Sequence, residues 1–167
     1  MKCPNCGTGD IELKRVMRPY DAGLPDILVD GLEHGECPSC GEVVAGVPRS
    51  LELGNMVLTA IIGKRSSLAG NEIRYLRRSL GLKSSELGER LAVNEQQVSR
   101  WETGKRPMAA AADRLLRMLV AMEYDIAAPD LASIDHTLPT APLPLHVELG
   151  RRGWKVVQPR AKTARAA

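Results

Sequence analysis

The segment from Asn94 to Pro107 most constrains the fold, because it predicts one short helix that leaves most of its side chains in solvent. Asn94 can cap the start of this helix, and Gly104 followed by Pro107 ends it. Only Val98 and Trp101 are apolar and able to anchor the helix to the rest of the protein. Such a helix is either an ordinary solvated helix or one whose polar face binds a partner.

The polar face of this helix suits DNA. Gln and Arg side chains one turn apart can form paired hydrogen bonds with adenine and guanine edges, and basic residues after the helix can meet a phosphate. The side chains expected to contact DNA from this segment are Gln96, Gln97, Ser99, Arg100, Lys105 and Arg106.

Helical spacing recurs on both sides of this segment. Apolar residues favour further helices over residues 71–79, 84–91 and 109–122. Residues 92–93 leave only a tight turn between the helix at 84–91 and the exposed helix. Two short helices joined in this way predict a helix-turn-helix, which favours DNA over the solvated alternative.

The stretch from Leu82 to Gly104, with its Ser-Arg-Trp-Glu-Thr-Gly core, resembles the Xre/Cro family of DNA-binding domains over about residues 68–122. Two positions depart from the family pattern. The family usually has Ala in the second helix and Gly at the turn, whereas this chain has Gly88 in the helix and Ala92 at the turn, as if the two were exchanged. Gly88 lowers helix propensity by about 1 kcal/mol relative to Ala, and Ala92 must accept a backbone geometry that Gly eases. Ser84 replaces the Gln that often opens the second helix in this family, so the phosphate contact that the resemblance implies either comes from the shorter Ser84 or is lost.

All four cysteines fall into two copies of Cys-Pro-x-Cys-Gly, at residues 3–7 and 37–41. In such a knuckle, proline starts a turn and glycine permits the positive φ that leaves amide groups facing the thiolates. Four thiolates suit tetrahedral zinc. The ligands predicted for one structural Zn²⁺ per chain are Cys3, Cys6, Cys37 and Cys40.

Other uses of these cysteines remain open. Rubredoxin-like iron uses similar knuckles, and a redox centre would use a single Cys-x-x-Cys motif in an alternating strand and helix pattern. Two disulfides would require an oxidising compartment, but the chain begins without a predicted signal peptide. His34 lies near the second knuckle, but with four cysteines present we expect it to be a surface residue.

The chain has 167 residues and no Phe, which argues against one large core. Its charge is also unevenly distributed along the sequence. Residues 1–50 carry more acids than bases, whereas residues 63–124 are basic, as a polyanion partner requires. We expect a zinc-binding domain over residues 1–50, with short strands near 12–17 and 27–32. Residues 51–67 are expected to form a linker helix and a flexible basic joint, and residues 68–124 the helix-turn-helix domain.

The tail at residues 125–167 is Pro-rich and then basic, and it forms either a short hairpin or stays disordered. The hairpin would pair residues 146–149 with residues 153–157. The fold class expected from these parts is mainly α with a small N-terminal β zinc-binding domain. A bundle of four or five helices of the Xre type would fill the C-terminal half.

The order of the two modules, paired cysteine knuckles followed by an Xre-type helix-turn-helix, resembles the MqsA/YgiT-type antitoxins of bacterial toxin–antitoxin systems over about residues 1–122. The resemblance implies a structural zinc domain that binds a toxin, often an RNA-cleaving one. It also implies a C-terminal domain that dimerises and represses its own operon, with bases read at Gln96 and Arg100. A zinc-containing Xre-family regulator with no toxin partner is the alternative.

A short recognition helix reads few base pairs, so we expect a homodimer on a palindromic operator in double-stranded DNA. The residues expected at the dimer interface are Leu115, Leu116, Leu119 and Val120. No phosphate loop, HExxH motif or Ser-His-Asp set is present, which predicts that the protein is not an enzyme. No apolar span is long enough for a membrane, so we expect a cytoplasmic bacterial protein.

Overall fold

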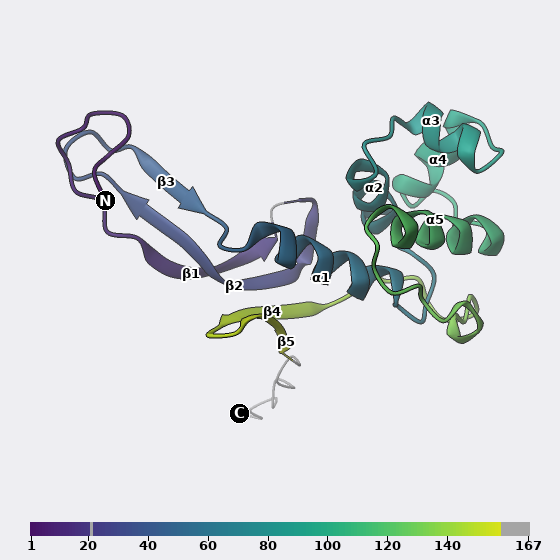
Figure 1. Cartoon of the computed structure of the whole chain (residues 1–167). Helices are drawn as coiled ribbons and strands as arrows, with labels where there is room; N and C mark the ends of the chain where they lie inside the picture. Colours follow the sequence, from purple (N-terminus) through teal and green to yellow (C-terminus); the bar gives the residue numbers. More distant parts are fainter. Residues whose placement is uncertain (21, 158–167) are drawn as a thin grey trace, which may run out of the picture.

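The computed structural model describes residues 1–20 and 22–157. The strands of the described residues are β1 (Lys14–Tyr20), β2 (Leu24–Glu36), β3 (Val43–Gly46), β4 (Leu145–Gly150) and β5 (Gly153–Val157). The α-helices are α1 (Ser50–Ile62), α2 (Gly70–Ser79), α3 (Ser84–Arg90), α4 (Glu95–Glu102) and α5 (Ala110–Glu123), with a 3-10 turn at Leu131–Ser133. We call the strands with α1 the sheet half and α2 to α5 the helical half (Figure 1).

The five strands found in the described residues form one mixed sheet in the order β1-β2-β4-β5, with β3 paired to β2 as well. β2 is the central strand and is antiparallel to β1 and β3. β4 lies parallel to β2, with Ile27 opposite Leu145 and Asp30 opposite Glu148. β5 returns antiparallel to β4.

The expectation of a mainly α protein, with its sheet confined to a small N-terminal domain and a helix bundle filling the C-terminal half, is therefore wrong. β2 runs for 13 residues, and the C-terminal hairpin joins the same sheet. The hairpin is held there because Val147, Leu149 and Trp154 are buried against the sheet half. Its partner strand lies more than 100 residues earlier in the chain, where no local pattern indicates the pairing.

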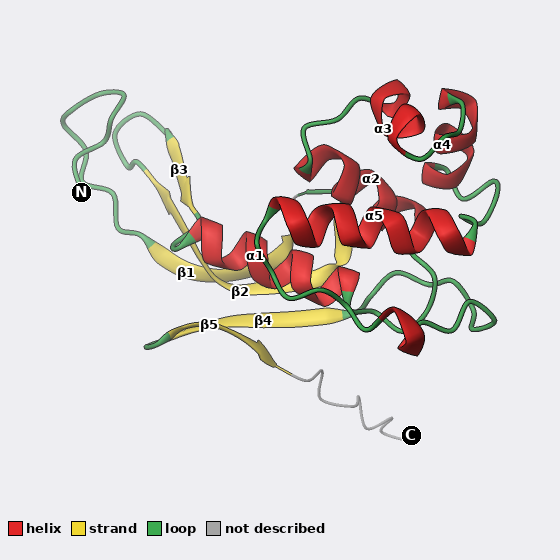
Figure 2. Cartoon of the chain, turned by 45° about the vertical axis from the view of Figure 1, so that its right-hand side comes forward, coloured by secondary structure: helices red, strands yellow, loops and turns green. Residues whose placement is uncertain are grey.

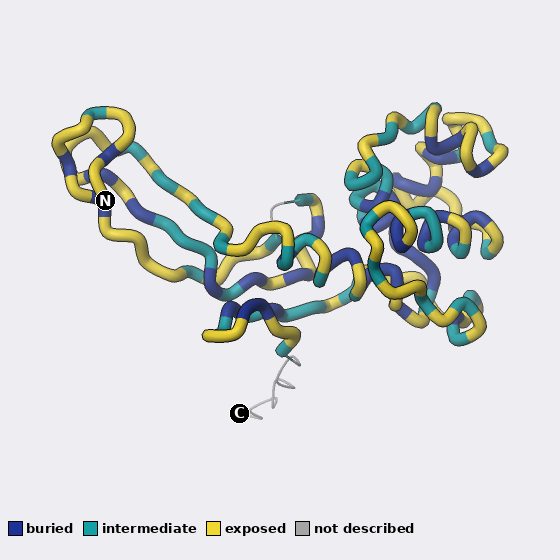
Figure 3. Tube along the Cα trace, in the orientation of Figure 1, coloured by how far each residue is buried: buried dark blue, intermediate teal, exposed yellow. Residues whose placement is uncertain are grey.

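α1 lies along the sheet and leads into the helical half, whereas the N-terminal knuckles lie at the far end of the long hairpin (Figure 2). Leu53, Val57 and Ile61 of α1 are fully buried. They belong to one apolar core that continues from β2 and β4 into α2, α4 and α5. Buried residues accordingly gather where the two halves meet, while the knuckle end is mostly exposed (Figure 3).

The segment 63–67, expected to be a flexible joint, is held by buried hydrogen bonds. Arg117 of α5 is fully buried and donates to the carbonyl oxygens of Ile62, Lys64 and Ser66. The Asp113 carboxylate accepts from the Arg117 guanidinium. These bonds satisfy carbonyl groups that would otherwise be unpaired in the interior.

Candidate metal centre and nucleic-acid interface

The four cysteines come together at the knuckle tip, which is the end of the sheet that contains the turn between β2 and β3. Their Sγ atoms all lie within 4.8 Å of one another. The Cys3 and Cys40 sulfur atoms are 3.6 Å apart, and those of Cys6 and Cys37 are 3.7 Å apart. A tetrahedral ion bound at about 2.3 Å from each sulfur requires sulfur–sulfur separations close to these. The cluster therefore fits a metal ion without rearrangement.

Glycines make this geometry possible. Gly7 and Gly41 have φ values of 69° and 72°, as the knuckle pattern predicts, and their amides donate to the Cys3 and Cys37 carbonyl oxygens. Gly9 was not singled out from the sequence. A Cβ atom at Gly9 would lie 2.3 Å from the Cys37 sulfur, so no larger residue fits beside this cluster.

The thiols of the cluster differ in acidity before a metal binds. The Thr8 hydroxyl, together with the backbone amides of Gly9 and Thr8, stabilises the Cys6 thiolate and lowers its pKa to about 5. At Cys40 the Glu42 amide lowers the pKa, but burial and the neighbouring sulfur atoms outweigh it and raise the pKa to about 12. A cation that replaces the shared protons would remove this difference, because metal ligation requires thiolates. His34 is not part of the sulfur cluster.

α4 is anchored on one side and exposed on the other. Val98 and Trp101 are buried, and the Asn94 side chain accepts a hydrogen bond of 2.9 Å from the Gln97 amide at the start of the helix. Gln97 is half-buried, whereas Gln96, Ser99 and Arg100 are exposed. A hollow of about 420 Å³ on the outer side is lined by Glu95, Gln96, Ser99, Arg100, Thr103 and Lys105.

Glu102 positions α4 and was missed in the sequence, because its partners lie on another helix. The Glu102 carboxylate is buried and accepts from the guanidinium groups of Arg77 and Arg74 on α2. Arg77 also donates to the Leu82 carbonyl oxygen at 2.7 Å. The ion pairs thus hold α4, α2 and the loop before α3 together.

The turn between α3 and α4 gives a structural reason for Gly88 and Ala92, the two residues that depart from the family pattern. Ala92 has a φ of 54°, in the left-handed region that glycine adopts without strain. A Cβ atom on Gly88 would lie 2.7 Å from the Val93 carbonyl oxygen, so Gly88 allows the turn to pack directly against α3. Close packing at one position therefore accompanies backbone strain at the other.

The remaining residues expected at DNA lie beside α4 or at the start of α3. Ser84 is the first residue of α3 and is half-buried. Lys105 and Arg106 are exposed in the turn that follows α4.

The residues expected at a dimer interface divide into two groups on α5. Leu115 is exposed and Leu119 is half-buried. Leu116 and Val120 are fully buried in the core of their own chain. Their side chains are therefore unavailable to a second copy in this structure, because α5 turns that face toward α1 and α2.

The fold combines a helical half with a sheet half whose four cysteine sulfur atoms are placed as in a metal site. A family model described as "Antitoxin component of bacterial toxin-antitoxin system, MqsA" matches residues 1–123. The match spans most of the chain, which therefore belongs to the MqsA antitoxin family, as the resemblance in the sequence indicated. Membership favours a regulatory role over an enzymatic one.

No protein with curated annotation matches the chain. None of the helices in the described part of the chain has the length and apolar content needed to cross a bilayer.

Proposed function

We propose that this antitoxin binds DNA in a sequence-specific manner, represses its own operon and neutralises a toxin protein. The observation that carries the proposal is α4, a helix anchored by Val98 and Trp101 whose outer face presents amide, hydroxyl and guanidinium groups around an open hollow. No apolar residue lines that hollow. A helix with this surface fits the major groove of DNA.

Within this proposal, Gln96 and Arg100 read base edges. Their side chains lie one turn apart on the exposed face of α4, so both reach the same groove. Gln97 and Ser99 flank them, and Ser84, Lys105 and Arg106 contact phosphates. The ion pairs of Glu102 keep α4 in place, which reduces the entropy lost when DNA binds.

The metal in this proposal is one structural Zn²⁺ per chain. Cysteine thiolates prefer zinc over hard cations, and four protein ligands leave no position for a reactive water. The ion would hold the two knuckles together and take no part in catalysis.

The DNA-bound form is a homodimer in this account. Leu115 and Leu119 lie on the outer side of α5, and Met122, which is 75% exposed, extends the same apolar stripe. Two copies joined there would present two α4 helices to a palindromic operator, with half-sites about 34 Å apart.

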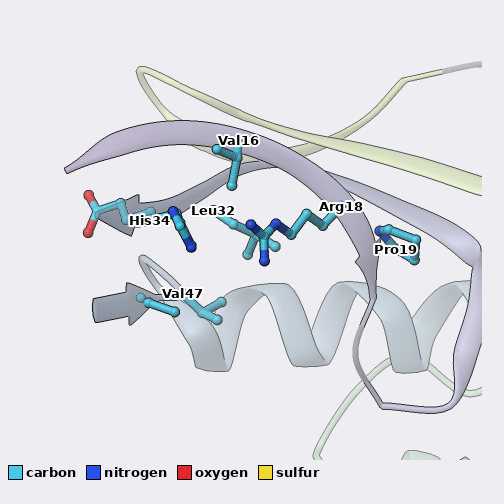
Figure 4. Close-up of a pocket in the computed structure, with 9 residues that line it drawn as sticks. Val16, Arg18, Pro19, Leu32, His34 and Val47 are labelled. Atoms are coloured by element: carbon cyan, nitrogen blue, oxygen red, sulfur yellow. The ribbon is translucent and has the colours of Figure 1, made fainter. Parts of the chain in front are cut away.

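The toxin would bind the sheet half. A hollow of about 210 Å³ lies between β1, β2, β3 and the residue that follows β3, with Val16, Leu32 and Val47 around it and Arg18 and His34 directed into it (Figure 4). Met17 and Val43 are also more than half exposed on these strands. A mostly apolar hollow that also contains a guanidinium group, an imidazole and the Glu33 carboxylate suits a protein partner. An RNA-cleaving toxin is our candidate for that partner, as the resemblance in the sequence implies.

The DNA proposal is tested with the region upstream of the protein's own gene and with random DNA of equal length. Arg100→Ala should lose about 1 to 3 kcal/mol on the specific site and little on random DNA. Lys105→Ala should weaken both DNAs alike and lower the salt dependence. Equal losses on both DNAs for Arg100→Ala would show that α4 does not read bases.

The toxin proposal is tested by producing this chain together with the protein encoded next to it. Restored growth and a complex that survives purification are the expected results. Purified chain that binds specific DNA but never suppresses the neighbouring protein's toxicity would support a regulator without a toxin.

A further inference from the structure

Residues 124–157 lie beyond the part of the chain that matches the family and return from α5 to the sheet (Figures 1 and 2). We call this segment the C-terminal strap. Along the chain, the strap contacts first the joint between the halves, at residues 135–136, then α2 at residue 143, and it ends in the β4–β5 hairpin. Each of these three sections is fixed to a different part of the protein.

The first anchor is in the helical half. Glu72 of α2 is 1% exposed, and its carboxylate accepts a hydrogen bond of 2.7 Å from the Leu143 amide of the strap. Lys64 is ion-paired with Glu72 and donates to the Ala141 carbonyl oxygen at 2.8 Å. The charges of Lys64 and Glu72 are both buried, and the strap, together with the Ala69 amide, supplies the further hydrogen-bond partners that such a pair needs.

The second anchor is at the joint. The Asp135 amide donates to the Arg65 carbonyl oxygen at 2.7 Å. The Ser67 hydroxyl and the His136 Nδ1 atom are 3.0 Å apart. Ile134, next to these residues, is 6% exposed. The strap therefore covers the segment that connects the two halves.

The third anchor is in the sheet half. Four residue pairs join β4 to the centre of β2. Trp154 of β5 is buried, and its indole Nε1 donates to the Pro48 carbonyl oxygen at 2.8 Å. The Trp154 amide donates to the Glu52 carboxylate at the start of α1.

We propose that the C-terminal strap fixes the sheet half against the helical half, so that the free protein moves as one rigid body. Apart from the strap, the halves are connected by the segment 63–69, by the Arg117 hydrogen bonds to that segment and by the apolar core that they share. The strap adds a second covalent crossing to this packing, and the two crossings together limit the rotation of one half against the other. A partner on the sheet half would then meet DNA bound by the helical half in one set geometry. This consequence rests on the proposed function, whereas the rigid arrangement does not.

The arrangement is tested by measuring the distance between spin labels on position 43 of β3 and position 122 of α5. Val43 and Met122 are both more than half exposed, and labels on bioorthogonal amino acids leave the native cysteines free for metal. The unmodified strap should give one narrow distance distribution. Leu143→Pro, which removes the amide that binds Glu72, combined with Trp154→Ala should at least double the width of that distribution.

Thr140→Pro is the matched control, because it adds a proline to the same exposed segment without removing any hydrogen bond found in the structure. It should retain the narrow distribution. Nuclear spin relaxation of the milder Leu143→Pro variant gives a second reading, in which the two halves should tumble with different correlation times. A broad distribution with the intact strap, or an unchanged narrow one in the double variant, would overturn the proposal. Specific DNA binding by the double variant at wild-type affinity would leave the proposed function intact in either case.

Discussion

The knuckle tip and the main core are stabilised in different ways. The tip contains a small cluster of three buried residues, Cys3, Ile11 and Cys37, with Cys6 and Val44 against it. The main core is one continuous cluster that extends from the sheet through α1 into the helical half. With the proposed Zn²⁺ bound, one short chain combines a region held by metal–sulfur bonds with a region held by apolar packing.

Magnitudes support this distinction. Burying one isoleucine contributes about 1.5 to 3 kcal/mol, whereas ordering each residue costs about 1 to 2 kcal/mol in backbone entropy. Ile11 alone cannot order two knuckles. The tip therefore needs the metal, because binding free energy of a structural Zn²⁺ in small peptides is about 10 to 16 kcal/mol.

Metal removal should have the largest effect, and it should unfold the knuckle tip while the main core stays folded. A strong chelator, or Cys37→Ser, is expected to abolish hydrogen-exchange protection in residues 1–11 and 37–42. Amides of α1, α2 and α5 should keep their protection, since their core does not include the cysteines. Exchange measured by mass spectrometry on both forms checks this prediction. Loss of protection in α5 along with the tip would show that the two regions fold as one unit.

Arg117→Met should strongly destabilise the main core and leave the tip bound to metal. The substitution leaves the Asp113 carboxylate buried without its cation and removes bonds to three carbonyl groups. Breaking a buried pair in this way costs about 3 to 5 kcal/mol. Denaturant unfolding followed by helix content measures the loss.

Arg78→Met is the control for that experiment, because Arg78 is an exposed arginine on α2. Its midpoint should stay close to that of the wild type. Equal midpoints for both variants would mean that the buried arginine does not hold the halves together.

The sequence predicted the parts of the molecule whose signals are local. The knuckles, the Asn94 cap and the exposed face of α4 each lie within a few consecutive residues, and each has a pattern with a known physical cause. The pairing of β4 with β2, the Glu102 ion pairs and the Arg117 bonds to the segment 62–66 all depend on partners more than 20 residues away. The sequence also did not distinguish the exposed from the buried apolar residues of α5, because an apolar pattern does not tell which face of a helix its own chain covers.

The turn between α3 and α4 gives the smallest expected effect, and it lies in the helical half, away from the knuckle tip. Ala92→Gly should stabilise the protein by about 1 kcal/mol, because it relieves a left-handed alanine. Gly88→Ala should destabilise it, since the new Cβ would meet the Val93 carbonyl oxygen. Thermal unfolding of the two variants should move the midpoint in opposite directions. A stabilising Gly88→Ala would mean that the turn is looser than described.

The central claim is that the helical half reads DNA while the metal only holds the tip. It is tested most directly by measuring the affinity of native and metal-free protein for the upstream DNA and for random DNA. The account predicts that the ratio of the two affinities changes by less than about threefold when metal is removed, since every proposed base contact lies on α4. A metal-free protein that no longer distinguishes the two DNAs, while its helices remain protected from exchange, would contradict the claim.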